Sequence, residues 1–176
     1  MSIPSRKIKL SIFLRRPLHG DHYSIERLFD AIVVALPADR YEVRWRVCPI
    51  ESKGLLRRLA LIIWAACRQG DVNHITGDIN FLGLLMRRSR TLLTITDSAS
   101  MWRLVGWRRW FYKTFWLRLP IWRAGHVTAI SEATLGETMS YVCSDPTKFS
   151  VIPCCTPLGM LAEPRPFPDS RPRILA

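Results

Sequence analysis

The stretch HVTAISEATLGETMSYVCSDPTKFSVIP, from His126 to Pro153, determines the fold class expected for this chain. A short β-branched run comes first, Ser131 then stands where it can cap a helix, and a second β-branched run follows the Asp145-Pro146 turn. A helix between two such strands joins them in parallel, almost always by a right-handed crossover. We therefore expect an α/β fold: a Rossmann-like parallel sheet with helices on both faces.

The rest of the chain alternates strand and helix patterns in the same way. The expected strands are residues 8–14, 41–47, 71–76 and 91–96, and the expected helices are residues 24–36, 54–69, 81–88 and 101–120. The first strand is apolar on both faces, which predicts burial, whereas the second alternates with charged residues, which predicts a position near a sheet edge. Gly70 is expected to cap the helix before it, and Pro120 to end the last of these helices.

Length and composition predict one domain with a hydrophobic core, because 48% of the 176 residues are hydrophobic. Residues 1–153 would form this domain, and residues 154–176, with five prolines, are typical of a stiff linker that leads into a further domain. The net charge of +12 predicts attraction to an anion. Nucleic acid, an anionic membrane leaflet and a phosphorylated small molecule are the three candidates.

The five cysteines include no C-x-x-C pair and have no spacing typical of a zinc site. We interpret them as reduced thiols of a cytosolic protein and expect no metal. The longest apolar segment, residues 59–67, is far shorter than the roughly 20 residues of a membrane-spanning helix.

Residues 101–123 differ in composition from the rest, with five of the seven tryptophans, six basic residues and no acidic residue. The basic residues scatter around a helical wheel, so the pattern does not support an amphipathic membrane helix. Two interpretations of the segment remain. It could be a helix that packs on the sheet while its arginines reach solvent, or it could form a surface that binds an anionic membrane or a lipid-linked acceptor. That candidate surface comprises Trp102, Trp107, Arg108, Arg109 and Trp110. Nucleic acid is not expected, because no nucleic-acid motif accompanies the charge.

Polar residues follow the expected strands at their carboxyl ends, where open parallel sheets bind ligands. They are residues 17–22, residues 76–80, Asp97 with Ser98, and Ser131 with Glu132. Turn residues are polar in any α/β protein. The pattern alone therefore fits ordinary turns without a ligand as well as it fits a binding cleft. Ser131 could cap a helix or contact a substrate. His74 lies inside a strand and is expected to be a hydrogen-bonded core or rim histidine more than a ligand for substrate. Asp97 is the strongest candidate, because a carboxylate that ends an apolar strand needs a partner.

Three segments resemble, in order, the N-terminal domain of family-4-type glycosyltransferases of the GT-B class. They are DVNHITGD at residues 71–78, LLTITD at 92–97 and the stretch at 127–153; HGDHYSIER at 19–27 extends the likeness to nearly the whole chain. The resemblance implies retaining transfer of a sugar from a nucleotide-sugar donor to an acceptor. The nucleotide sugar would be a co-substrate, and neither a cofactor nor a metal would be needed.

The resemblance also implies roles for individual residues. The first loop, with His19, Gly20 and Tyr23, would approach the donor phosphates. Gly77, Asp78, Ser131 and Glu132 are expected to bind substrate on the same rim because they follow the carboxyl ends of strands. Thr96 and Asp97 stand where the family has its catalytic His-Asp pair. Thr96 departs from that pattern, because a hydroxyl does not carry a proton at neutral pH. Cys154-Cys155 also departs from it, since an Asn-Gly pair often follows the last Ile-Pro.

The chain is therefore expected to be the acceptor-side half of such an enzyme and to be inactive alone, because the donor-binding domain would only begin near Arg173. Its expected partners are a nucleotide sugar, an acceptor, a separate C-terminal domain and the inner, cytoplasmic face of an anionic membrane. The alternative function is that of a non-catalytic basic α/β module that binds an anionic membrane or nucleic acid.

Overall fold

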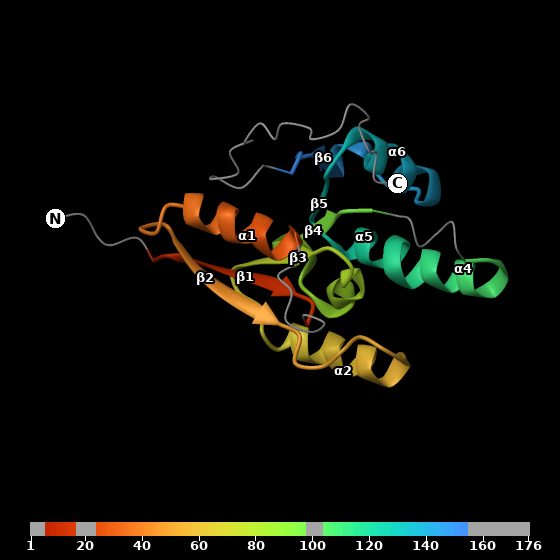
Figure 1. Ribbon diagram of the computed structural model, residues 1–176, viewed down its shortest axis with the longest axis horizontal. Helices are drawn as coiled ribbons and strands as arrows, with labels where there is room; N and C mark the ends of the chain where they lie inside the picture. Colours follow the sequence, from red (N-terminus) through yellow and green to blue (C-terminus); the bar gives the residue numbers. More distant parts are fainter. Residues whose placement is uncertain (1–5, 17–23, 98–103, 155–176) are drawn as a thin grey trace, which may run out of the picture.

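The computed structural model describes residues 6–16, 24–97 and 104–154 (Figure 1). In chain order, the elements are β1 (Ile8–Leu14), α1 (Ser24–Ala35), β2 (Tyr41–Val47), α2 (Leu55–Ala66), β3 (Val72–Thr76), the 3₁₀ segments η1 (Asn80–Leu85) and η2 (Arg88–Arg90), β4 (Thr91–Ile95), α4 (Gly106–Tyr112), the π-helical segment η3 (Lys113–Arg118), α5 (Leu119–Arg123), β5 (His126–Ala129), α6 (Glu132–Tyr141), the 3₁₀ turn η4 (Pro146–Lys148) and β6 (Phe149–Val151).

The six strands form one sheet in the order β2-β1-β3-β4-β5-β6, and every neighbouring pair is parallel. This confirms the α/β class and the Rossmann-like parallel sheet. The edge position expected for residues 41–47 is also confirmed, because β2 pairs only with β1. Since the strands are parallel, their carboxyl ends share one edge of the sheet.

Helices cover both faces of the sheet, as expected. On one face α1 places Phe29 against Ile12 of β1. On the other face α2, η1, η3 and α5 pack on Phe13, Ile75 and Leu93 and form the main core. The direction of each crossover explains this division: right-handed crossovers that travel in opposite directions along a sheet place their helices on opposite faces. The connection from β1 to β2 runs one way, and the later connections run the other way.

The stretch from residue 126 to 153 folds as its pattern predicts. β5 and β6 are parallel neighbours with Val127 opposite Phe149, and α6 connects them. Ser131 caps α6, because its Oγ accepts a hydrogen bond from the Thr134 amide at 3.1 Å. That bond satisfies one of the amides that the first turn of a helix leaves unpaired.

Gly70 does not cap α2, so that expectation was wrong. The helix ends at Ala66 with Cys67 as its cap. A Cβ at Gly70 would lie 2.4 Å from the Lys9 carbonyl oxygen. A glycine is therefore needed here for the close approach of two backbones.

Pro120 does not end the helix of the aromatic-basic segment, which is a second correction. Helical backbone continues from Gly106 to Arg123, with the π-helical segment η3 just before the proline. A proline ring clashes with the carbonyl four residues earlier in an α-helix, and a wider turn relieves such a clash. The helix expected over residues 81–88 is the 3₁₀ segment η1.

His74 is a partly buried, hydrogen-bonded histidine within β3. Its Nε2 lies 2.7 Å from Thr94 Oγ1, and the edge of its ring meets Phe29 at a centroid distance of 4.8 Å. Among the described cysteines, Cys48, Cys67, Cys143 and Cys154 are free thiols. Nearly all of the expected linker lies outside the described residues.

Candidate functional site

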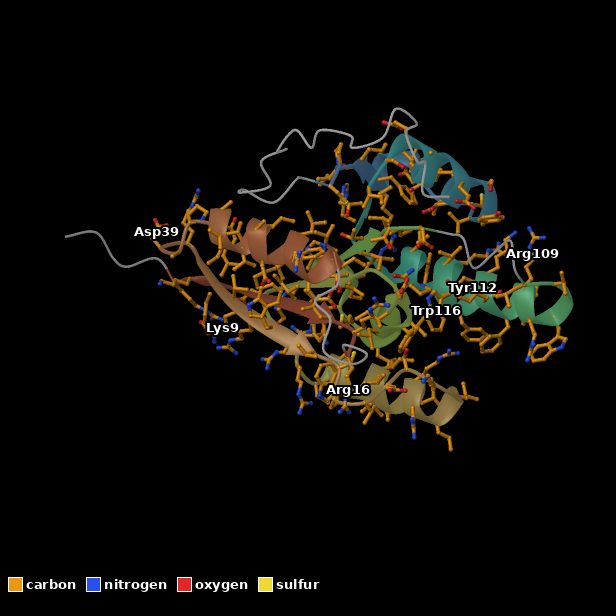
Figure 2. All side chains as sticks on the ribbon, viewed as in Figure 1. Lys9, Arg16, Asp39, Arg109, Tyr112 and Trp116 are labelled. Atoms are coloured by element: carbon orange, nitrogen blue, oxygen red, sulfur yellow. The ribbon has the colours of Figure 1, made fainter. Side chains whose placement is uncertain are left out.

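A cavity of about 430 Å³ opens at the carboxyl edge of the sheet, between α2 and η3. The ends of four strands reach it, through Arg15 after β1, Cys48 after β2, Asp78 after β3 and Asp97 after β4. Arg16, Ile50, Glu51, Ser52, Lys53, Arg58, Ile79, Tyr112 and Trp116 complete its lining. Figure 2 shows Arg16, Tyr112 and Trp116 on the side of the molecule away from Lys9 and Asp39.

Four basic side chains and three carboxylates line this cavity, so its walls carry an excess of positive charge. Arg15 Nη1 lies 3.1 Å from Asp78 Oδ2, and Lys53 Nζ lies 2.9 Å from Glu51 Oε2. The lysine lowers the pKa of Glu51, mainly through its hydrogen bond. These exposed pairs add little to stability.

Backbone carbonyls hold two further arginines at the rim of the cavity. Arg16 Nη1 donates to the Pro49 carbonyl at 2.7 Å, and Arg58 Nε donates to the Ser52 carbonyl at 2.9 Å. Each guanidinium has five N–H donors, so a single such bond fixes its position and leaves most of its donors for an anion.

Aromatic rings form one wall of the cavity. Tyr112 stacks on Trp116 with centroids 5.3 Å apart and an interplanar angle of 15°, and Phe81 packs against Trp116 from the core. The Arg58 guanidinium lies 4.6 Å from the centroid of the Trp116 ring. Partial burial lowers the pKa of Arg58, which nevertheless stays protonated at neutral pH. The wall thus joins a flat apolar surface to a fixed cation.

Cys48 is the one thiol in the described part of the lining, and its environment makes it unreactive. Burial raises its pKa to about 11. The thiolate, which is the nucleophilic form, is therefore scarce at neutral pH.

Two of the residues expected at the site from sequence, Asp78 and Asp97, lie together in the cavity lining. Gly77 adopts a positive φ of 58° beside them, and a Cβ there would meet Ile25 at 2.9 Å and Thr96 Oγ1 at 4.0 Å. Thr96 thus lies near the turn after β3, although it does not line the cavity.

Ser131 and Glu132 begin α6 at the same edge of the sheet, but neither lines this cavity. The hydroxyl of Ser131 serves the helix, bonding both the amide and the hydroxyl of Thr134. His19, Gly20 and Tyr23 lie outside the described residues, as does Trp102.

The sequence interpretation missed the contribution of β2 and α2 to the cavity. Glu51, Ser52 and Lys53 follow β2 directly, so the rule applied to the carboxyl ends of the other strands would have found them. Arg15 and Arg16 were visible as a basic pair at the end of β1. No local pattern pointed to Arg58 or Trp116, which meet only through the packing of α2 against η3.

The candidate surface on α4 is largely exposed. Trp107 and Trp110 are 75% and 64% exposed. The Arg108 guanidinium lies 5.9 Å from the Trp107 ring, and that of Arg109 lies 6.0 Å from the Tyr141 ring of α6. These two tryptophans belong to no core of the domain.

Taken together, these features describe an α/β protein with a Rossmann-like parallel sheet and a basic, aromatic-walled cavity at its carboxyl edge. Comparison with protein-family models, with curated proteins and with solved structures gives no match to this chain. Within residues 6–16, 24–97 and 104–154, no three potential metal ligands among His, Cys, Asp and Glu gather in one place. No helix in this part of the chain has the length and apolar character to span a membrane.

Proposed function

We propose that this chain takes part in glycosyl transfer from a nucleotide-sugar donor to an acceptor, as the acceptor-side domain of a retaining glycosyltransferase. The observation that carries the proposal is the cavity at the carboxyl edge, where Asp97 and Asp78 lie among four basic side chains. The order of the segments that resemble family-4-type glycosyltransferases supports the same conclusion.

The cavity residues suit the two kinds of group that such a reaction brings together. Arg15 and Arg16 stand at the start of the first loop, where guanidinium groups would pair with the donor phosphates. Asp97 would accept a hydrogen bond from the acceptor hydroxyl while the oxygen of that hydroxyl forms a bond to the anomeric carbon of the sugar. The bond from that carbon to the nucleotide diphosphate breaks, and the hydroxyl proton leaves with the diphosphate or to solvent.

Further parts of the proposal concern partners and location. A separate C-terminal domain would bind the nucleotide, and the reaction would run at the cytoplasmic face of a membrane. The exposed tryptophans and arginines of α4 support attachment to that surface. The reaction we propose needs no metal and no cofactor.

A sugar-transfer assay tests the proposal. The gene is read through the codon for Ala176, so that any following domain is included, and its product is incubated with labelled UDP- and GDP-sugars and a lipid extract as acceptor. We expect transfer, with kcat/KM reduced by about 10²-fold or more in Asp97→Ala. Asp39→Ala, at the far end of the molecule, should leave the rate unchanged. Full activity in Asp97→Ala would remove Asp97 from the site, and absence of transfer from every donor would refute the proposal.

A second candidate function rests on a basic hollow of about 350 Å³ at the opposite edge of the sheet. Arg6, Lys9, Arg44, Arg87 and Arg90 line it, with Asp71 as the only acidic residue in the described lining. Such a hollow favours a non-catalytic module that binds a polyanion. Strong nucleic-acid binding that weakens steeply with salt, and that is lost in Arg87→Glu/Arg90→Glu, would favour this function over glycosyl transfer.

A further inference from the structure

The outer face of α2 carries an apolar stripe that nothing in the described structure covers. Leu61, Ile62 and Ala65 turn inward and are buried. On the outer side Leu55, Leu56, Leu59 and Ile63 are 60%, 81%, 48% and 59% exposed. Positions 55, 59 and 63 follow each other at intervals of four residues, so they form one stripe along the helix.

A second exposed apolar group lies on α4, on the other side of the cavity. Val105, at the start of this helix, is 77% exposed, and Trp107 and Trp110 follow it. Both helices begin at the same end of the molecule, on the side to which the carboxyl ends of the strands point, and run back along the sheet (Figure 1). Arg58 of α2 over Trp116 of η3 joins the two sides at the cavity. The two apolar groups therefore lie on helices that each supply part of the cavity wall.

Charge indicates what would cover these helices. Residues 51–66 contain Lys53, Arg57 and Arg58 against Glu51, and residues 104–123 contain five basic residues and no acidic one. A second copy of the chain would bring an equally positive face to this one, so self-association is disfavoured. An anionic bilayer offers the opposite charge and an apolar layer beneath it.

We propose that α2 and α4 form one membrane-binding surface, which inserts apolar side chains into an anionic bilayer and places the cavity beside the lipid headgroups. α2 is the new part of this surface, because the sequence interpretation placed only residues 102–110 at the membrane. The inference deepens the membrane location in the proposed function, but binding to vesicles requires neither a sugar donor nor catalysis.

Vesicle sedimentation tests this surface in the full 176-residue chain. Binding is measured to phosphatidylcholine vesicles with and without phosphatidylglycerol, for the wild type, Leu55→Ser/Leu56→Ser on α2 and Trp107→Ala/Trp110→Ala on α4. Val34→Ser is the matched control, because Val34 is 83% exposed on α1, away from both helices. All substituted side chains are exposed, so folding should be retained, and circular dichroism checks it.

We expect the wild type to prefer vesicles that contain phosphatidylglycerol, and each double variant to bind roughly tenfold more weakly. Val34→Ser should bind as the wild type does. Equal binding by the α2 variant and the wild type would overturn the proposal, as would equal binding to both kinds of vesicle or to neither. A dimer in sedimentation velocity that the α2 variant dissociates would assign the stripe to a second copy and also overturn it. Vesicle binding without any sugar transfer would leave this inference standing while the proposed function failed.

Discussion

Acidification should destabilise the fold through His74. The ring lies between Thr94 and Phe29, and burial lowers its pKa from 6.5 to about 4. The neutral ring is therefore the form that the folded state accepts, whereas the unfolded chain takes up the proton near pH 6.5. Because the folded pKa is the lower one, stability is complete above pH 6.5 and falls as the pH drops towards 4.

The size of this effect follows from the difference between the two pKa values. Lowering the pKa of His74 from 6.5 to about 4 corresponds to a difference of about 3 kcal/mol in the free energy of unfolding between neutral pH and a pH well below 4. The conversion is about 1.4 kcal/mol per pKa unit. Between pH 7 and pH 5, the loss in unfolding free energy should be about 2 kcal/mol. That is a large share of the stability of an ordinary domain, roughly 5–15 kcal/mol.

Urea unfolding at pH 7 and pH 5, followed by tryptophan fluorescence, measures this loss. His74→Gln replaces the ring with an amide that does not titrate, so the loss between the two pH values should shrink by about 2 kcal/mol. Thr94→Val removes the hydrogen-bond partner but leaves the ring buried, so this control should keep the wild-type pH dependence.

An unchanged pH dependence in His74→Gln would show that burial of this ring does not control acid stability. An NMR titration provides a second check, since the ring signals of His74 should move with a midpoint near 4. A midpoint near 6.5 would contradict the reasoning directly.

Further predictions concern the backbone around β5 and α6, and the unfolding midpoint in urea measures each of them. Gly125→Ala should destabilise the protein by about 1–3 kcal/mol, because the added Cβ would lie 2.5 Å from the Arg88 carbonyl oxygen. Gly136 lies in α6, and no atom lies within 4 Å of a Cβ added there, so Gly136→Ala should instead stabilise the protein by up to about 1 kcal/mol. If Gly136→Ala destabilised the protein as much as Gly125→Ala, the argument from close approach would be contradicted. Ser131→Ala should cost about 1 kcal/mol, whereas Ser131→Asp should restore the cap.

The order of apolar and polar residues along the chain was enough to predict the parallel sheet. Successive side chains of a strand point to opposite faces of the sheet. The apolar residues on both faces of β1 therefore indicated a central strand, and the alternation of apolar and charged residues in 41–47 indicated an edge strand. Local signals failed where backbone segments far apart in the sequence approach each other. The sequence predicted Gly70 as a helix cap, but the residue is a glycine because the Lys9 carbonyl approaches it closely. The sequence also predicted that Pro120 ends a helix, whereas the helix continues past this residue after a π-helical segment.

The candidate site was predictable only in part, for a similar reason. Asp78 and Asp97 follow strands directly, so the rule for parallel sheets placed them at one edge, and the structure puts both in one cavity. Arg58 is central to a helix and Trp116 is part of a long aromatic segment, so nothing local marked either of them. They meet because α2 and η3 pack on the same face of the sheet.

The sequence by itself thus determined the class of fold, the edge of the sheet where the cavity opens, and two of the carboxylates that line it. Periodicity and strand ends are local properties, which is why they could be read from residue order. Only the tertiary structure decided that Arg58 of α2 meets Trp116 in one wall of the cavity, and that α2 leaves Leu55, Leu56 and Leu59 exposed. Which side of an apolar helix becomes the core depends on the partners that fold against it, and residue order alone does not specify them.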